Sequence, residues 1–141
     1  MNSKEMLTSV LHTVQMGQAG IQCVQDQAVR IGLKKQLRQQ LEQYDAIETT
    51  AKQLAKEHQW VLSDVPKSVV KMSDLMTKVR LLGGDRDSKI AGMLIQGNTR
   101  GIILGMKNLR KAQSADPQVR LLTEKLIQQE RTSIDNTKPY L

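Results

Sequence analysis

The sequence is poor in the residues on which many common folds and sites depend. It has one cysteine, Cys23, so the chain cannot build a disulfide framework or a cysteine-based zinc site. Aromatic residues are limited to Tyr44, Trp60 and Tyr140, and phenylalanine is absent. Three prolines and nine glycines leave little material for a β-rich fold with many turns. These shortages favour an all-α structure.

Membrane-spanning and secretory segments are also not indicated. The segment from Met6 to Gln25 has no formal charge, but it carries four glutamines, and hydrocarbon would leave their amides without hydrogen-bond partners. The residues from Met1 to Glu5 run directly into an amphipathic pattern, without the apolar core and cleavage site of a secretory signal. We therefore expect a cytoplasmic protein that does not bind membranes.

What is present fits one globular unit. The chain has 141 residues, of which 39% are apolar, and 21 Lys and Arg against 14 Asp and Glu give a net charge of +7. This length and composition are typical of a single folded domain, here residues 1–141.

Apolar residues recur at three- and four-residue steps through the whole chain, which is the spacing of one helix face. Capping residues, prolines and glycines mark the ends of the helices. The pattern predicts a first helix from a capping box at Asn2 and Glu5 to about Val29, a break at Gly32, and a second helix from Leu33 to about His58. A third, shorter helix follows a cap at Asp64, has Pro66 in its first turn and extends to Leu82. The last two helices run from a cap at Asp85 or Asp87 to Lys111, and from Pro117 to at most Pro139.

The four long helices form two hairpins, joined by a long connection that contains the shorter helix. This wiring predicts a four-helix bundle with an additional crossover helix and an aliphatic, methionine-containing core. The crossover helix has an apolar stripe of its own, made of Val69, Met72, Leu75, Met76, Val79 and Leu82.

The first helix has a second, weakly apolar strip opposite its main one, made of Met16, Ala19 and Cys23. A helix that is apolar on more than one side is usually buried on more than one side. Either the crossover helix or a second copy of the protein could cover this strip. We favour a homodimer.

One stretch of the third long helix carries a family resemblance. It is Met93-Leu94-Ile95-Gln96-Gly97-Asn98-Thr99-Arg100-Gly101-Ile102-Ile103, followed by the basic turn Lys107-Asn108-Leu109-Arg110-Lys111. With the two hairpins and the crossover helix, it resembles the ferritin-like superfamily, in particular small bacterial four-helix-bundle proteins that lack the di-metal ligands. The resemblance implies a ferritin-like bundle.

Catalytic members of that superfamily hold two metal ions with a Glu from each of two helices and a Glu-x-x-His from each of the other two. This chain departs from that pattern. Glu42 and Asp45 form a Glu-x-x-Asp pair on the second helix, and Glu130 on the last helix has no His three residues later. We therefore expect no catalytic residues and no cofactor, with Glu42, Asp45 and Glu130 as the least favoured alternative, a degenerate metal site.

Glycines on the first and third long helices predict a close helix crossing. Gly97, Gly101 and Gly105 fall on one helix face, and Gly17 and Gly20 are natural partners on the first helix. Each glycine costs about 0.5–1 kcal/mol relative to alanine inside a helix, which favours a packing role. A cofactor pocket is the alternative.

Glutamines suggest a polar layer inside the bundle. Gln18 lies in a row along one side of the first helix, and Gln96 and Gln129 could complete a layer where the family's metal would sit. The alternative is a half-buried flank whose amides bond to neighbouring helices.

Basic residues make nucleic acid or another polyanion a candidate partner, with possible contacts at Lys34, Lys35, Arg38, Lys107, Arg110 and Lys111. A solvated basic face is the favoured alternative. Our overall expectation is a non-enzymatic bundle that acts through protein–protein contacts, with the nucleic-acid-associated bundle as the second hypothesis.

Overall fold

The computed structural model describes all residues, 1–141, and every regular element of the chain is a helix, which confirms the predicted all-α class. Its elements are α1 (Ser3–Val24), a short 3-10 turn (Gln25–Gln27), α2 (Ile31–Glu57), α3 (Lys67–Arg80), α4 (Arg86–Lys111), α5 (Pro117–Thr137) and a final 3-10 turn (Lys138–Tyr140). No helix combines the length and apolarity needed to cross a bilayer.

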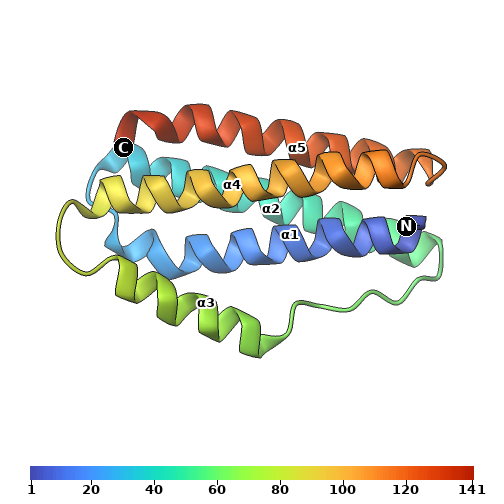
Figure 1. Cartoon of the computed structure of the whole chain (residues 1–141), viewed down its shortest axis with the longest axis horizontal. Coiled ribbons are helices and arrows are strands. Elements are labelled where there is room, and N and C mark those ends of the chain that lie inside the picture. Colours follow the sequence, from blue (N-terminus) through green and yellow to red (C-terminus); the bar gives the residue numbers. More distant parts are fainter.

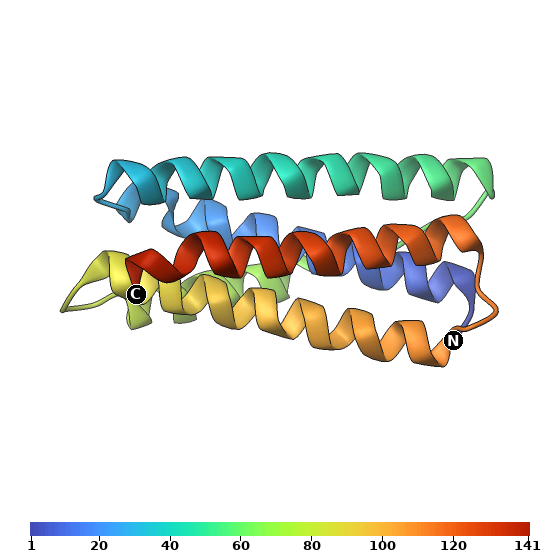
Figure 2. The same ribbon diagram turned by 90° about the horizontal axis from the view of Figure 1, so that it is seen from above.

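The four long helices lie side by side, and the shorter α3 lies outside them (Figure 1). α1 and α2 form one antiparallel hairpin and α4 and α5 form the other, with α2 packed on α5 and α1 on α4 (Figure 2). α3 belongs to the long connection between the hairpins and packs against α1. Of the two ways in which the first helix could be covered, by the crossover helix or by a second copy of the protein, the structure shows the crossover helix.

Three predicted helix starts are confirmed by their caps. The Asn2 side chain accepts a hydrogen bond from the Glu5 backbone N–H at 2.8 Å, and the Glu5 carboxylate accepts one from the Asn2 N–H at 3.1 Å. Asp85 caps α4 through the Ser88 N–H, and Asp116 caps α5, whose first residue is Pro117. Local capping chemistry was sufficient to locate these ends.

Two predicted boundaries are wrong. α1 ends at Val24 rather than near Val29, and Gly32 lies inside the first turn of α2, so the break falls at residues 28–30. Asp64 does not cap the crossover helix. Its carboxylate accepts a hydrogen bond from the Gln15 side chain at 2.8 Å, and α3 begins at Lys67 with Pro66 at the cap position.

The turn that leads into α2 is held by a residue from a distant part of the chain. Asp87, in the first turn of α4 and 3% exposed, accepts hydrogen bonds from the Val29 N–H at 2.8 Å and the Arg30 N–H at 3.0 Å. The Arg30 guanidinium lies 3.6 Å from the same carboxylate. These contacts connect the turn of the first hairpin to the second hairpin.

We expect Asp87→Ala to lower the free energy of unfolding by about 2 kcal/mol, because two backbone donors lose their acceptor. Urea denaturation measures the change. Asp135→Ala is the matched control, since Asp135 is 72% exposed and makes only a surface ion pair with Lys138, so its removal should be nearly neutral. Equal effects of the two changes would contradict the role of Asp87 in holding the turn before α2.

The core follows the predicted stripes of the long helices, including Leu7, Val10 and Val14 on α1 and Leu33 and Leu37 on α2. It is not purely aliphatic. Tyr44 is 5% exposed within it, and buried polar side chains of α4 and α5 lie beside it. The expectation of an aliphatic core is therefore wrong at its centre.

The apolar stripe of α3 does not face the core. Val69, Met72, Leu75, Met76, Val79 and Leu82 are 47–74% exposed. The side turned toward α1 is mostly small and polar instead: Ser73 and Asp74 are half-buried and Thr77 is buried, with Val70 as its half-buried apolar residue. The amphipathic pattern predicts the helix correctly, but its apolar side is largely exposed, because α3 covers α1 with its other side. Val69, Met72 and Met76 on the exposed side border a second pocket that Arg100 of α4 also lines.

Candidate functional site

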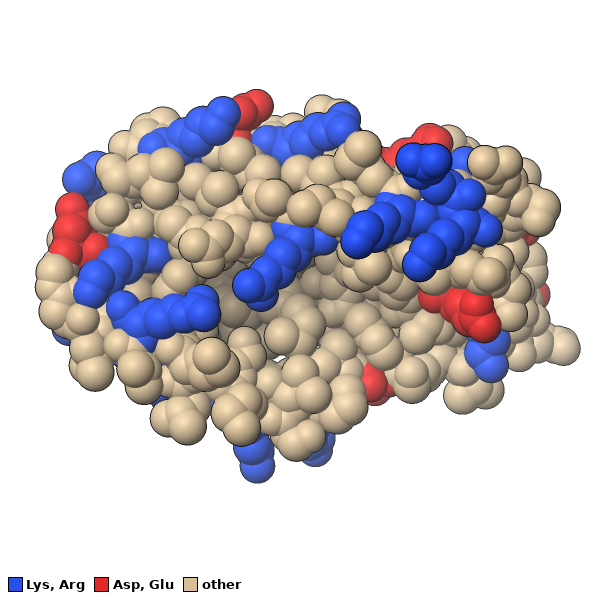
Figure 3. Space-filling view, in the orientation of Figure 1, with Lys and Arg blue, Asp and Glu red and all other residues tan.

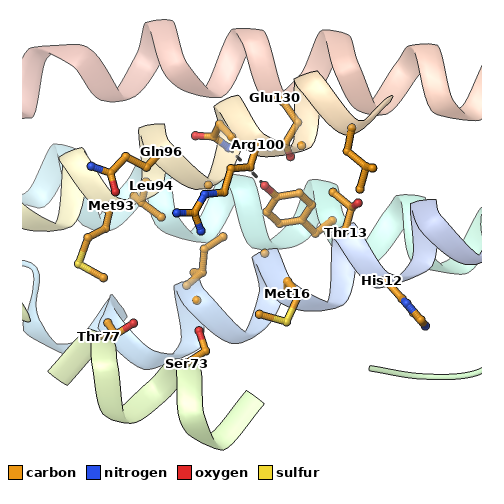
Figure 4. Close-up of a pocket in the computed structure, with 18 of the residues that line it drawn as sticks. His12, Thr13, Met16, Ser73, Thr77, Met93, Leu94, Gln96, Arg100 and Glu130 are labelled. Carbon is orange, nitrogen blue, oxygen red and sulfur yellow. Dashed lines mark hydrogen bonds between the residues drawn. The ribbon is translucent and has the colours of Figure 1, made fainter. Parts of the chain in front are cut away.

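A groove of about 630 Å³ runs between α1, α3 and α4. The face drawn in Figure 3 is hollowed between α4 and α3, with basic side chains around the hollow. Apolar side chains from α1 and α4 form much of its walls, including Met16, Ile21, Met93, Leu94 and Leu104. Figure 4 shows Met16 and Met93 on opposite sides of this space.

The groove exists partly because two wall positions have no side chain. A Cβ atom placed on Gly20 or on Gly97 would have no heavy atom within 4 Å, so both positions border open space. Any larger residue at these two sites would project into the groove. The two glycines therefore set its width.

A buried polar cluster borders the groove from the side of α2 and α5. The Asn98 amide donates to the Glu130 carboxylate at 3.0 Å and lies 3.3 Å from the Tyr44 hydroxyl oxygen. Asn98 is 3% exposed and Glu130 is 1% exposed. Glu130 Oε1 and Asn98 Oδ1 have no hydrogen-bond partner. Two buried acceptors therefore lack a donor, which is uncommon in folded proteins.

Burial controls the ionisation of this cluster. It raises the pKa of Glu130 to about 7, against the opposing effect of hydrogen bonds with Tyr44 and Asn98. Burial also raises the pKa of the Tyr44 phenol well above its usual value, and the nearby Glu130 carboxylate adds to that increase. A carboxyl group that titrates near neutral pH thus borders a mostly apolar groove.

Charged and titratable side chains also line the groove. Figure 4 shows Arg100 extending from α4 into the space between α4 and α1. His12 lies on the α1 side, where its Nε2 is 2.8 Å from the Ser63 carbonyl oxygen. The groove therefore combines a cationic side chain near its opening with a buried carboxyl group at depth.

The five predicted packing glycines separate into two groups. A Cβ on Gly17 would lie 2.6 Å from the Tyr44 ring, one on Gly101 would lie 3.0 Å from Glu130 Oε2, and one on Gly105 would lie 2.7 Å from Ile127 Cγ1. These three glycines admit side chains of α2 and α5, and Gly101 also admits Thr13 of α1, whose Cγ2 would lie 3.3 Å from the added Cβ. Gly20 and Gly97 border the groove, so the glycines of α1 and α4 do not pack on each other as expected.

The predicted glutamine layer is not assembled. The Gln18 amide donates to Asp45 at 2.8 Å and to Glu48 at 3.4 Å across the first hairpin. Gln96 is exposed at the groove and Gln129 is half-buried, and no hydrogen bond joins any two of the three. The polar layer in the middle of the bundle consists of Tyr44, Asn98 and Glu130 instead.

The weak metal candidates are not brought together. Glu42 and Asp45 are exposed on α2, whereas Glu130 is buried on α5. No group of three or more His, Cys, Asp or Glu side chains is arranged to hold a metal ion. The three carboxylates therefore do not form one site.

The candidate polyanion contacts fall into two separate groups. Lys34, Lys35 and Arg38 are exposed near the start of α2, and Lys107, Arg110 and Lys111 are exposed at the end of α4. These helix ends lie at opposite ends of the bundle (Figure 1, Figure 2). The six residues do not form one continuous basic patch.

Tyr44 and Asn98 are site residues that were not predicted from the sequence. Tyr44 occupies an apolar stripe position, and Asn98 lies within the stretch that carries the family resemblance. A polar residue at a core position of a helix is the feature that could have identified Asn98, because such a group needs a partner. Comparison with protein-family models, curated proteins and solved structures gave no significant match.

Proposed function

We propose that the protein acts by contact with other folded chains rather than by catalysis, and that it is a homodimer formed through the outer face of α3. The observation that carries this proposal is the exposed apolar stripe of that helix. Contiguous exposed apolar patches on soluble proteins mark interaction sites. The two antiparallel hairpins joined by a long crossover support a ferritin-like arrangement. A cytoplasmic location stays a prediction.

The size of the face suits a second copy. Complete burial of one Val, Leu or Met side chain contributes about 1.5–3 kcal/mol. Burying the exposed portions of six such side chains on each of two copies would therefore contribute roughly 10–20 kcal/mol to dimer formation. Association costs about 4–15 kcal/mol in lost freedom, so the face is large enough for a dimer. Two copies can bury identical faces around a two-fold axis.

We expect light scattering across a sizing column to give twice 15.9 kDa for the wild-type chain. Leu75→Glu should give a mass of 15.9 kDa, because it places a charge in the centre of the buried face. Leu121→Glu is the matched control: Leu121 is 63% exposed on α5 and Leu75 is 61% exposed on α3. Leu121→Glu should remain dimeric.

Salt distinguishes this proposal from the alternatives. Each copy carries a net charge of +7, so screening should strengthen a homodimer as salt is raised from about 0.05 to 0.5 M. A nucleic-acid complex would weaken over the same range and would absorb strongly at 260 nm. A monomer at all protein and salt concentrations would contradict the dimer.

A further inference from the structure

The groove between α1, α3 and α4 contains acceptors without donors. Glu130 Oε1 and Asn98 Oδ1 are buried and unpaired, and both residues line the groove. Gln40 Oε1 is the third unpaired buried atom, but Gln40 bonds to Thr137 and does not line the groove. A buried acceptor without a partner is costly, and the cost disappears when a ligand supplies the donor.

No cation of the protein neutralises Glu130. The charged or titratable groups that line the groove with it are Glu5 and His12 of α1, Tyr44 of α2, Arg80 of α3 and Arg100 of α4. None of them forms an ion pair with the Glu130 carboxylate. A buried carboxylate is normally paired with a positive group when it is ionised.

We propose that the groove binds a small primary amine with an apolar body, whose ammonium group donates hydrogen bonds to Glu130 and Asn98 while its hydrocarbon lies between α1 and α4. Leu75, at the centre of the proposed dimer face, does not line this groove, and amine binding does not depend on dimer formation.

The chemistry of the cluster selects among ligand classes. Both unpaired atoms accept, so the ligand must donate, and a charge-assisted hydrogen bond to a carboxylate is stronger than one between neutral groups. A carboxylic acid ligand would place a second negative charge beside Glu130. A quaternary ammonium ion has the charge but no N–H group, and only Tyr44 could offer it an aromatic ring.

The groove has room for the apolar body. Its volume of about 630 Å³ lies within the range of small-molecule sites. The open space beside Gly20 and Gly97 accommodates the chain, and Met16, Met93 and Leu94 supply flexible apolar contacts.

The proposed binding has a specific pH dependence. The pKa of Glu130 is about 7, and an alkylamine stays protonated well above that value because its pKa is near that of lysine, about 10.4. Ionised Glu130 is the binding form, so affinity should rise with pH. From the fraction ionised, it should be about tenfold tighter at pH 8 than at pH 6.

Titration calorimetry on the full chain at pH 8 tests the ligand class. The probes are octylamine, 1-octanol, octanoate and octyltrimethylammonium, which share one chain and differ in the head group. We expect octylamine to bind at least tenfold more tightly than the other three. Equal binding of octylamine and octyltrimethylammonium, or no binding of octylamine at millimolar concentration, would overturn the proposal.

Three variants locate the site. Glu130→Gln keeps the size of the side chain, and we expect it to lose at least tenfold in octylamine affinity together with the pH dependence. Gly97→Leu fills the open part of the groove and should cause a similar loss at every pH. Leu75→Glu, on the outer face of α3 and away from the groove lining, should bind octylamine as the wild type does.

Circular dichroism confirms that each variant is folded before it is titrated. Wild-type affinity in Glu130→Gln would overturn the proposal. A pH profile that persists in that variant would assign the pH dependence to a group other than Glu130 and would also overturn the proposal.

Discussion

The free energy of unfolding should fall by roughly 2–3 kcal/mol between pH 5 and pH 8, and Glu130→Gln should remove that loss. The pKa of Glu130 is raised from 4.5 to about 7 by burial. Above pH 4.5 the unfolded chain releases this proton, whereas the folded chain keeps it until about pH 7. Stability therefore decreases as the pH rises through this window and levels off above it.

Glutamine suits this position at every pH. It carries no charge to desolvate, and its amide adds a donor beside Asn98 Oδ1, which has none. Urea denaturation at pH 5, 6, 7 and 8 measures the profile. Glu124→Gln is the control, because Glu124 is exposed on the same helix and its removal should leave the wild-type profile. Parallel profiles for the wild type and Glu130→Gln would show that Glu130 does not carry the effect.

Two alanine substitutions on one face of α4 should have opposite effects. A Cβ on Gly105 would lie 2.7 Å from Ile127 Cγ1 and 2.9 Å from its Cδ1, so Gly105→Ala should cost about 1–3 kcal/mol through overpacking. A Cβ on Gly97 meets nothing within 4 Å, so Gly97→Ala should stabilise by about 0.5–1 kcal/mol through helix propensity.

The comparison is well matched, because the glycines lie in the same helix and receive the same side chain. Urea denaturation at one pH gives both values. Stabilisation by Gly105→Ala would mean that Ile127 has room to move away from α4. Destabilisation by Gly97→Ala would mean that the groove is closed at that position.

Local chemistry explains which elements could be predicted. Asn2 with Glu5, and Asp116 with Pro117, satisfy helix N-termini with residues that are close in sequence, so those starts were correct. The break before α2 was placed wrongly, at Gly32 instead of residues 28–30, because Asp87, which accepts from the Val29 and Arg30 N–H groups there, comes from a helix more than fifty residues later. A helix boundary that depends on a hydrogen-bond acceptor far away in the chain cannot be recognised from the neighbouring residues.

The candidate site was predicted only in part. Glu130 was considered for its carboxylate, and Gly20 and Gly97 for their missing side chains, but their roles differ from those expected. Tyr44, Asn98 and Glu130 come from three different helices, and only the packing of those helices brings them together. Because each helix contributes only one of the three residues, no spacing pattern in the sequence connects them.

The sequence by itself determined the all-α class, the succession of five helices and most of the buried stripes, because helix periodicity and capping act over a few residues. Only the tertiary structure decided which way the faces point. The stripe of α3 has the same period as a buried one, yet Leu75 is 61% exposed, because α3 covers α1 with Ser73 and Thr77. Burial of Glu130 likewise depends on which helices meet around it, and that choice of neighbours sets its pKa.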